Sequence, residues 1–243
     1  MTDREKRNAI RAYFNPFPKW ALGLVAFGVL CILTGGGGAI LGGLLFAGVG
    51  GAVLYLHTQR ISDAEFDRLR EEDLRKTVKN AIQKWGVDKD DIVSGPLHLY
   101  GPAFGATSTY ATRKGGDGII RFNPLRFAVI GFCEHQLLAY RGIIDMVTGN
   151  LLSEEASEYF YRDVVAAVVK TDSVEFTHRG VVHQLSDTET FALTTSGGTS
   201  IAVPIRSARL ATLLGGEMPN THAEAAIAAV RSMLRQKKSG IPV

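Results

Sequence analysis

The chain has 243 residues, of which 46% are hydrophobic and 21% are charged, and its formal net charge is +3 at pH 7. This length suits a membrane segment followed by one domain of ordinary size. Lysines and arginines are interleaved with acidic residues instead of forming one basic stripe, which argues against nucleic acid as a partner. The hydrophobic residues are unevenly distributed, because almost every position between 20 and 56 is apolar or glycine.

This uncharged segment predicts a membrane anchor. A single straight helix over residues 20–56 would be about 55 Å long, well beyond the roughly 30 Å hydrocarbon core of a bilayer. Four consecutive glycines follow Thr34, and each costs about 1 kcal/mol in a helix relative to alanine. We therefore expect a transmembrane α-helical hairpin at residues 20–57, with helices at 20–34 and 39–56. Since each helix is short for a full span, a re-entrant hairpin is the alternative.

Basic residues flank the apolar segment on both sides, in the N-terminal segment 1–19 and again from Arg60 onward. Lysine and arginine favour the cytoplasmic side of a membrane, and a hairpin places both flanks there. The sequence thus predicts an inner-membrane protein with cytoplasmic N- and C-termini. A cleaved signal peptide is the competing interpretation, but the apolar run is too long and no convincing cleavage site follows it. Two isolated cysteines, Cys31 and Cys133, fit a reducing compartment.

Small residues recur along the predicted hairpin. One ridge repeats every four residues and a second lies beside it; they comprise Gly35, Ala39, Gly43, Ala47 and Gly51, and Gly38 and Gly42. Small residues four positions apart let helix backbones approach closely in lipid. They either pack the two helices of the hairpin or assemble several copies of the chain, and we expect a homo-oligomer.

Residues 58–88 are expected to form an amphipathic connecting helix. Ser62 and Glu65 make a capping box at its start. Apolar residues then recur at helical spacing as far as Trp85, and Gly86 is a natural stop. The other face carries charges of both signs, which disfavours strong membrane binding, since helices that lie on membranes are usually basic.

Residues 89–243 show short runs rich in β-branched and aromatic residues, separated by glycine, asparagine, aspartate and serine. The predicted strands are 96–100, 107–113, 118–123, 126–133, 135–145, 158–171, 173–178, 183–185, 188–195 and 200–204. Glycine-rich turns at 115–118 and 196–198 indicate hairpins, and an amphipathic helix follows at 221–237. This order predicts an α+β soluble domain, a small antiparallel β barrel or sandwich capped by a C-terminal helix.

Several residues of this domain match a family pattern. They are Leu137 and Tyr140 on one predicted strand, the run YFYRDVV at 159–165, and Phe191, Leu193 and Val203 on a later hairpin. In this pattern the domain resembles the bacterial pleckstrin-homology-like (PH-like) domains, which are often attached to membrane hairpins. The resemblance covers about residues 90–240. It consists chiefly of core residues and turns, so it implies a fold more than an activity.

No motif for catalysis, metal or cofactor is apparent. The six histidines are scattered, and His178 and His183 lack a third ligand at useful spacing for zinc. The glycines at 35–38 have no following lysine and are no phosphate loop. Neither Cys133 nor any serine lies in a nucleophile motif. We therefore predict a protein that is not an enzyme and has no catalytic residues, metal site or cofactor; an unrecognised enzyme is the least favoured hypothesis.

Two functions fit this organisation. The first is a membrane-anchored scaffold or adaptor, which self-associates through the hairpin and presents its PH-like domain to a cytoplasmic protein partner. The second is a sensor of membrane lipid head groups. Eukaryotic pleckstrin-homology domains hold phosphoinositides with basic residues on an early strand and loop, and the nearest counterparts here are Arg113, Lys114, Arg121 and Arg126.

Overall fold

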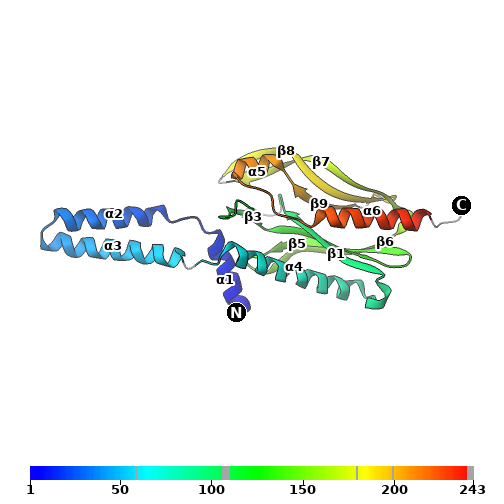
Figure 1. Ribbon diagram of the computed structural model, residues 1–243, viewed down its shortest axis with the longest axis horizontal. Coiled ribbons are helices and arrows are strands. Elements are labelled where there is room, and N and C mark those ends of the chain that lie inside the picture. The colour runs from blue at the N-terminus through cyan, green and yellow to red at the C-terminus, as the bar shows by residue number, and fades with distance from the viewer. Residues whose placement is uncertain (59, 106–109, 179, 199, 240–243) are drawn as a thin grey trace. The chain divides into compact units, whose positions relative to one another are not determined.

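The computed structural model describes residues 1–58, 60–105, 110–178, 180–198 and 200–239, and Figure 1 shows its elements. The chain divides into two compact units, Met1–Phe66 and Asp67–Val243, and each is considered by itself. Part of the predicted strand 107–113 lies outside the described residues.

The first unit contains α1 (Asp3–Phe14), α2 (Lys19–Thr34), α3 (Gly37–Thr58) and the start of α4 (Asp63–Trp85). Tyr13, near the end of α1, stacks on Phe66 with ring centroids 4.5 Å apart. Its hydroxyl donates a hydrogen bond of 2.7 Å to Asp63. These two contacts hold α1 against the first turn of α4.

α2 and α3 lie side by side as a helical hairpin (Figure 1). The break between them is Gly35–Gly36, and Gly37 and Gly38 already belong to α3, so the turn is shorter than predicted. A side-chain carbon added to Gly28 would lie 2.5 Å from the carbonyl oxygen of Gly43. The two backbones therefore meet at a distance that only glycine permits.

Length and composition single out α3 within the described residues as a helix that could cross a membrane by itself. Its 22 residues correspond to about 33 Å at 1.5 Å per residue. α2 passes the same test only together with α1, from which it is bent by 73°. The two predicted helices are thus present.

The second unit is built on antiparallel sheets. A four-stranded sheet has the order β1 (Ser94–Pro102), β4 (Leu125–Phe132), β5 (Gln136–Asp145) and β6 (Asn150–Phe160). A three-stranded sheet has the order β7 (Val164–His178), β8 (Val181–Thr195) and β9 (Ser200–Arg206). The remaining elements are the hairpin β2 (Ala111–Lys114) and β3 (Ile120–Asn123), α5 (Ala208–Leu214), α6 (Ala223–Ser239), and single 3-10 turns at Lys89–Asp91 and Tyr161–Asp163.

The main hydrophobic core lies between the two larger sheets, and α6 packs into it (Figure 1). Its buried residues include Leu99, Ile130, Phe132 and Leu137 from the first sheet, Phe191, Leu193, Ile201 and Val203 from the second, and Ala226, Ile227, Val230 and Leu234 from α6. Side chains of a strand alternate between its two faces. One face of each sheet is therefore committed to this core.

α4 covers the opposite face of the four-stranded sheet. A side-chain carbon on Gly131 would lie 3.0 Å from the ring of Trp85, and the ammonium group of Lys84 is 3.0 Å from Glu154. The guanidinium group of Arg70 lies 5.1 Å from the ring centroid of Tyr100. α4 thus contacts the sheet along much of its length, and the connecting helix becomes part of the domain.

The α+β class with mainly antiparallel sheets is confirmed, but some strand boundaries are wrong. The 3-10 turn Tyr161–Asp163 interrupts the predicted strand 158–171 and separates β6 from β7. The first part of β6 and the helix α5 were not predicted. β6 lies at the edge of its sheet and most of its side chains are exposed, so it lacks the apolar alternation by which strands are found.

Candidate functional site

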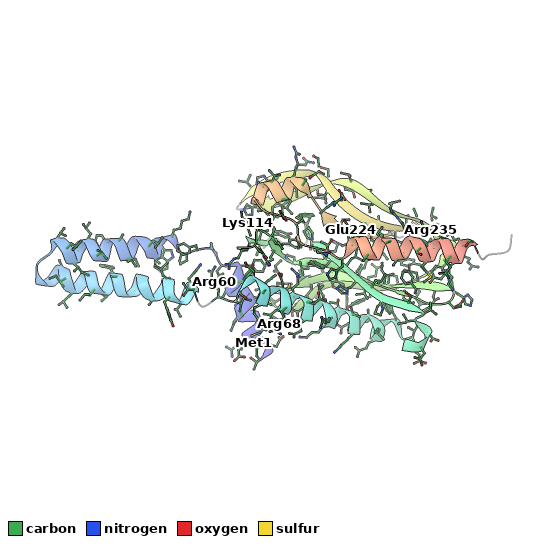
Figure 2. The ribbon with its side chains drawn as sticks, viewed as in Figure 1. Met1, Arg60, Arg68, Lys114, Glu224 and Arg235 are labelled. Carbon is green, nitrogen blue, oxygen red and sulfur yellow. The ribbon has the colours of Figure 1, made fainter. Side chains whose placement is uncertain are left out.

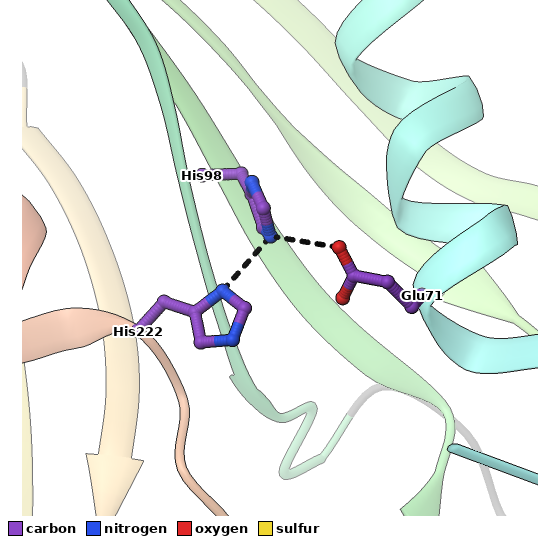
Figure 3. Close-up of side chains that lie close together, drawn as sticks. All are labelled: Glu71, His98 and His222. Carbon is purple, nitrogen blue, oxygen red and sulfur yellow. Dashed lines mark hydrogen bonds and ion pairs between the residues drawn. The ribbon is translucent and has the colours of Figure 1, made fainter. Parts of the chain in front are cut away.

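Three side chains that can ligate a metal meet on the α4 face of the four-stranded sheet. Glu71 comes from α4, His98 from β1, and His222 from the residue before α6. Figure 3 shows the three polar ends turned toward one another. The cluster therefore joins elements that lie far apart in the sequence.

The ring nitrogens of the two histidines are the closest pair. Nδ1 of His222 lies 2.9 Å from Nε2 of His98, and the same His98 atom is 3.7 Å from Oε1 of Glu71. The three ligand atoms lie within 4.8 Å of one another. A distance of 2.9 Å between two imidazole nitrogens is a hydrogen bond, so one ring donates the proton and the other accepts it.

The position of His222 is fixed by the backbone around it. The amide of Tyr100 donates to the carbonyl of Thr221 at 3.1 Å, and the Tyr100 hydroxyl donates to the carbonyl of Asn220 at 2.7 Å. The amide of His222 donates to Oδ1 of Asn220 at 2.9 Å. His222 has φ of +59°, a left-handed conformation that costs energy for a non-glycine residue and is found disproportionately at functional sites. Its ring is thereby held beside β1.

The surroundings of His98 favour its uncharged form. Burial is the main cause that lowers the pKa of His98; the carboxylate of Glu71 opposes it, and His222 and Arg75 add to the lowering. His98 is therefore neutral at neutral pH and keeps a nitrogen lone pair. Arg75 is largely exposed, and its Nε lies 3.6 Å from Oε1 of Glu71. These two contacts of the Glu71 carboxylate, with His98 and Arg75, are longer than a hydrogen bond.

Arg121, one of the residues predicted to bind lipid head groups, lies inside the domain. Its side chain is 1% exposed and pairs with two carboxylates, with Nη2 2.6 Å from Asp67 and 2.7 Å from Asp117. Its Nε also donates to Asp67 at 3.0 Å, and its Nη1 donates to Asp117 at 2.9 Å. Both pairs are bidentate, which neutralises the guanidinium group. The prediction for Arg121 is therefore wrong, because its charge is used within the fold.

The three other basic residues of that prediction have separate surroundings. Lys114, labelled in Figure 2, donates to the carbonyl of Gly215 at 2.7 Å, at the end of α5. Arg113 lies across from Arg121 in the β2–β3 pair. Arg126 is on β4, where burial and the nearby Arg141 lower its pKa.

The structure divides the predicted small-residue ridges into two groups. Gly43 is buried against Gly28 and Ile32 of α2, and Ala47 contacts Gly28. Gly35 and Ala39 lie together at the turn of the hairpin. The positions with open space around a side-chain carbon are Gly38, Gly42 and Gly51. The first group packs the hairpin itself, whereas the second has open space beside it among the described residues.

The aromatic run at 159–161 belongs mainly to the core of the domain. Tyr159 and Tyr161 are buried in the core, whereas Phe160 is 49% exposed and lies under the guanidinium group of Arg162 at 5.4 Å. Both cysteines are free thiols. Burial raises the pKa of Cys133, which makes it a poor nucleophile.

The Glu71–His98–His222 cluster was not predicted, because nothing in the sequence spacing signals it. His98 and His222 are 124 positions apart, and only the tertiary contact between β1 and the start of α6 unites them. Among the described residues, this cluster is the group of three side chains placed to hold a metal ion. Comparisons of the chain with protein-family models, curated proteins and solved structures find no match.

Proposed function

We propose that this protein is a non-enzymatic scaffold anchored in the inner membrane by the α2–α3 hairpin, with its second unit in the cytoplasm as a PH-like interaction domain. The observation that carries the proposal is the apolar surface of the hairpin. Its outward side chains are large and exposed, and they include Leu22, Phe27, Leu30, Leu33, Leu41, Leu44, Leu45 and Leu56. A continuous apolar surface of this kind requires lipid or protein around it.

The second unit supports the PH-like part of the proposal. Its two antiparallel sheets enclose one core with the C-terminal helix α6, which is the architecture that the sequence resemblance implies. The run 159–165 spans the turn between the sheets, and its two tyrosines are buried in that core. The pattern of the resemblance therefore coincides with residues that build the fold.

Membrane insertion is tested by fractionation of cells that express the full chain. We expect the protein to remain with the membranes through washes with alkaline carbonate and high salt, and to be released by detergent. The double variant Leu30→Arg, Leu45→Arg places two charges in the hairpin, at about 2.5–3.5 kcal/mol each at a helix centre, and should reduce the membrane fraction.

The control is Leu152→Arg, which puts one such charge on an exposed position of β6 and should leave the distribution unchanged. Recovery of the wild-type chain in the wash supernatant would disprove the anchor.

Self-association is tested on the same detergent extract by light scattering. Gly51 has open space around it, whereas Gly43 packs against α2. Gly51→Leu should therefore lower the mass of the oligomer while leaving the hairpin intact. Gly43→Leu should disturb the hairpin itself. A mass that stays unchanged in Gly51→Leu and in Gly42→Leu would count against assembly through this face.

A further inference from the structure

We propose that Glu71, His98 and His222 bind one zinc ion. Two imidazoles and one carboxylate are a ligand set that zinc uses in proteins, and the proposal is independent of the role of the hairpin. The site lies wholly within the second unit.

The spacing of the ligand atoms fits tetrahedral coordination. Zinc–ligand bonds of about 2.0–2.1 Å place neighbouring ligands of a tetrahedron roughly 3.3 Å apart. The two separations from Nε2 of His98 are 2.9 Å to His222 and 3.7 Å to Glu71, one slightly shorter and one slightly longer than this value. The third pair, Glu71 and His222, has ligand atoms within 4.8 Å of each other. Seating the ion therefore requires small side-chain shifts that bring the carboxylate and the His222 ring toward a common centre.

The surroundings supply what the ion needs. Zinc binds the lone pair of a neutral imidazole, and the two facing nitrogens share one proton between them, which a tautomeric shift moves to the far nitrogen of its ring. The Glu71 carboxylate would balance part of the metal charge, and its contacts with His98 and Arg75 are longer than hydrogen bonds. Three protein ligands leave one coordination position, which water would fill.

The site has a structural consequence. Its ligands come from α4, from β1 and from the entry to α6. Because α4 covers one face of the four-stranded sheet and α6 packs on the other, a bound ion would connect the two helices around the β1 edge of the sheet. Since a ligand that binds only the folded state stabilises it, zinc should raise the thermal midpoint of the domain.

The test uses the full chain in detergent, purified through a tag without histidine and stripped of metal with a chelator. We expect calorimetry to show one zinc ion per chain, with no comparable binding of magnesium, which prefers oxygen ligands. Cobalt(II), used as a visible probe, should give the absorption of a tetrahedral site. Saturable zinc binding should raise the thermal midpoint.

Variants identify the ligands. His98→Gln and His222→Gln should each weaken zinc binding by at least about 100-fold, since loss of an outer-shell partner alone costs 10–100-fold. Glu71→Gln keeps the side-chain shape and should weaken it by a smaller factor. Arg75→Gln removes the cation beside Glu71 and should strengthen it. His135→Gln, at an exposed position outside the cluster, is the matched control and should bind like wild type.

Circular dichroism without metal establishes that each variant is folded. Tighter zinc binding by Arg75→Gln, in addition, is a result that misfolding would not produce. The proposal is overturned if wild type binds no zinc, if His98→Gln and His222→Gln bind as tightly as wild type, or if His135→Gln loses the ion.

Discussion

At the scale of single residues, burial decides whether a charged side chain can contact a ligand or instead forms ion pairs within the fold. Arg121 lies on a strand beside a glycine-rich turn, where the sequence is compatible with a phosphate contact. In the fold it is enclosed, and Asp67 and Asp117 hold both edges of its guanidinium group. Desolvation of an arginine is costly unless such partners compensate it. The pairs therefore stabilise the junction of α4 with the β2–β3 hairpin.

Replacement of Arg121 tests this role. Arg121→Met should lower the free energy of unfolding by about 2–4 kcal/mol, because it removes the cation that Asp67 and Asp117 share and leaves Asp67 with its ion pair to Arg70. Arg162→Met is the matched control, since its ion pair with Asp163 is 3.8 Å long and exposed, and it should cost less than about 1 kcal/mol. Urea denaturation of the detergent-solubilised chain, followed by the fluorescence of buried Trp85, measures both. Equal effects would contradict the buried role of Arg121.

The same pairs predict a dependence on pH. Hydrogen bonds from Arg121, and then the amide of Ile119, hold the pKa of Asp117 well below its usual value. A carboxyl whose pKa is lowered by folding stabilises the native state above its unfolded pKa of about 4, and this stabilisation is lost as the pH falls. Asp117→Asn should therefore be less stable than wild type at pH 7, and the difference should shrink below about pH 4. A difference that is constant with pH would exclude this linkage.

At the scale of elements, the contact between β1 and β9 holds the two sheets together at one side. Gly101 of β1 is placed so that any side-chain carbon would overlap the carbonyl oxygen of Pro204 in β9. Neither atom can move without moving a strand. Close backbone approach thus requires glycine at this position, although its φ is not left-handed.

Gly101→Ala should lower the free energy of unfolding by about 1–3 kcal/mol, as expected for overpacking between backbones. Gly197→Ala is the control, because the nearest atom to its side-chain carbon would be 3.9 Å away and surface changes of this kind stay within about 0.5 kcal/mol. The same urea titration compares the two. A Gly101→Ala variant as stable as wild type would show that the sheets separate easily.

Elements with a local pattern could be predicted, and those without one could not. α4 and α6 were found because apolar residues recur along each at helical spacing, and Ser62 begins α4 with its hydroxyl accepting from the amide of Glu65 at 3.1 Å. The turns at 115–118 and 196–198 were found from their glycines. β6 was missed because an exposed edge strand is defined by its pairing with β5, which the local sequence does not record.

At the scale of the whole molecule, an apolar helical hairpin and a globular α+β domain belong to one chain. The first unit is dominated by an apolar hairpin whose glycines bring its helices into contact, and the second is an α+β domain with its own core. Gly43 shows what a ridge of small residues in the sequence does not reveal, namely which helix packs against it. A repeat of small residues cannot say whether the partner helix belongs to the same chain, and here Gly28 of α2 meets it.

The sequence by itself determined the apolar segment, its division into two helices, the amphipathic helices and the α+β class. These follow from composition and periodicity over neighbouring residues, where each side chain reports on its own surroundings. Only the tertiary structure decided that Arg121 is buried, that Gly43 packs within the hairpin, and that Glu71, His98 and His222 converge. Each of these depends on a partner distant in the chain, and the energy of such a contact exists only once the fold has brought both partners together.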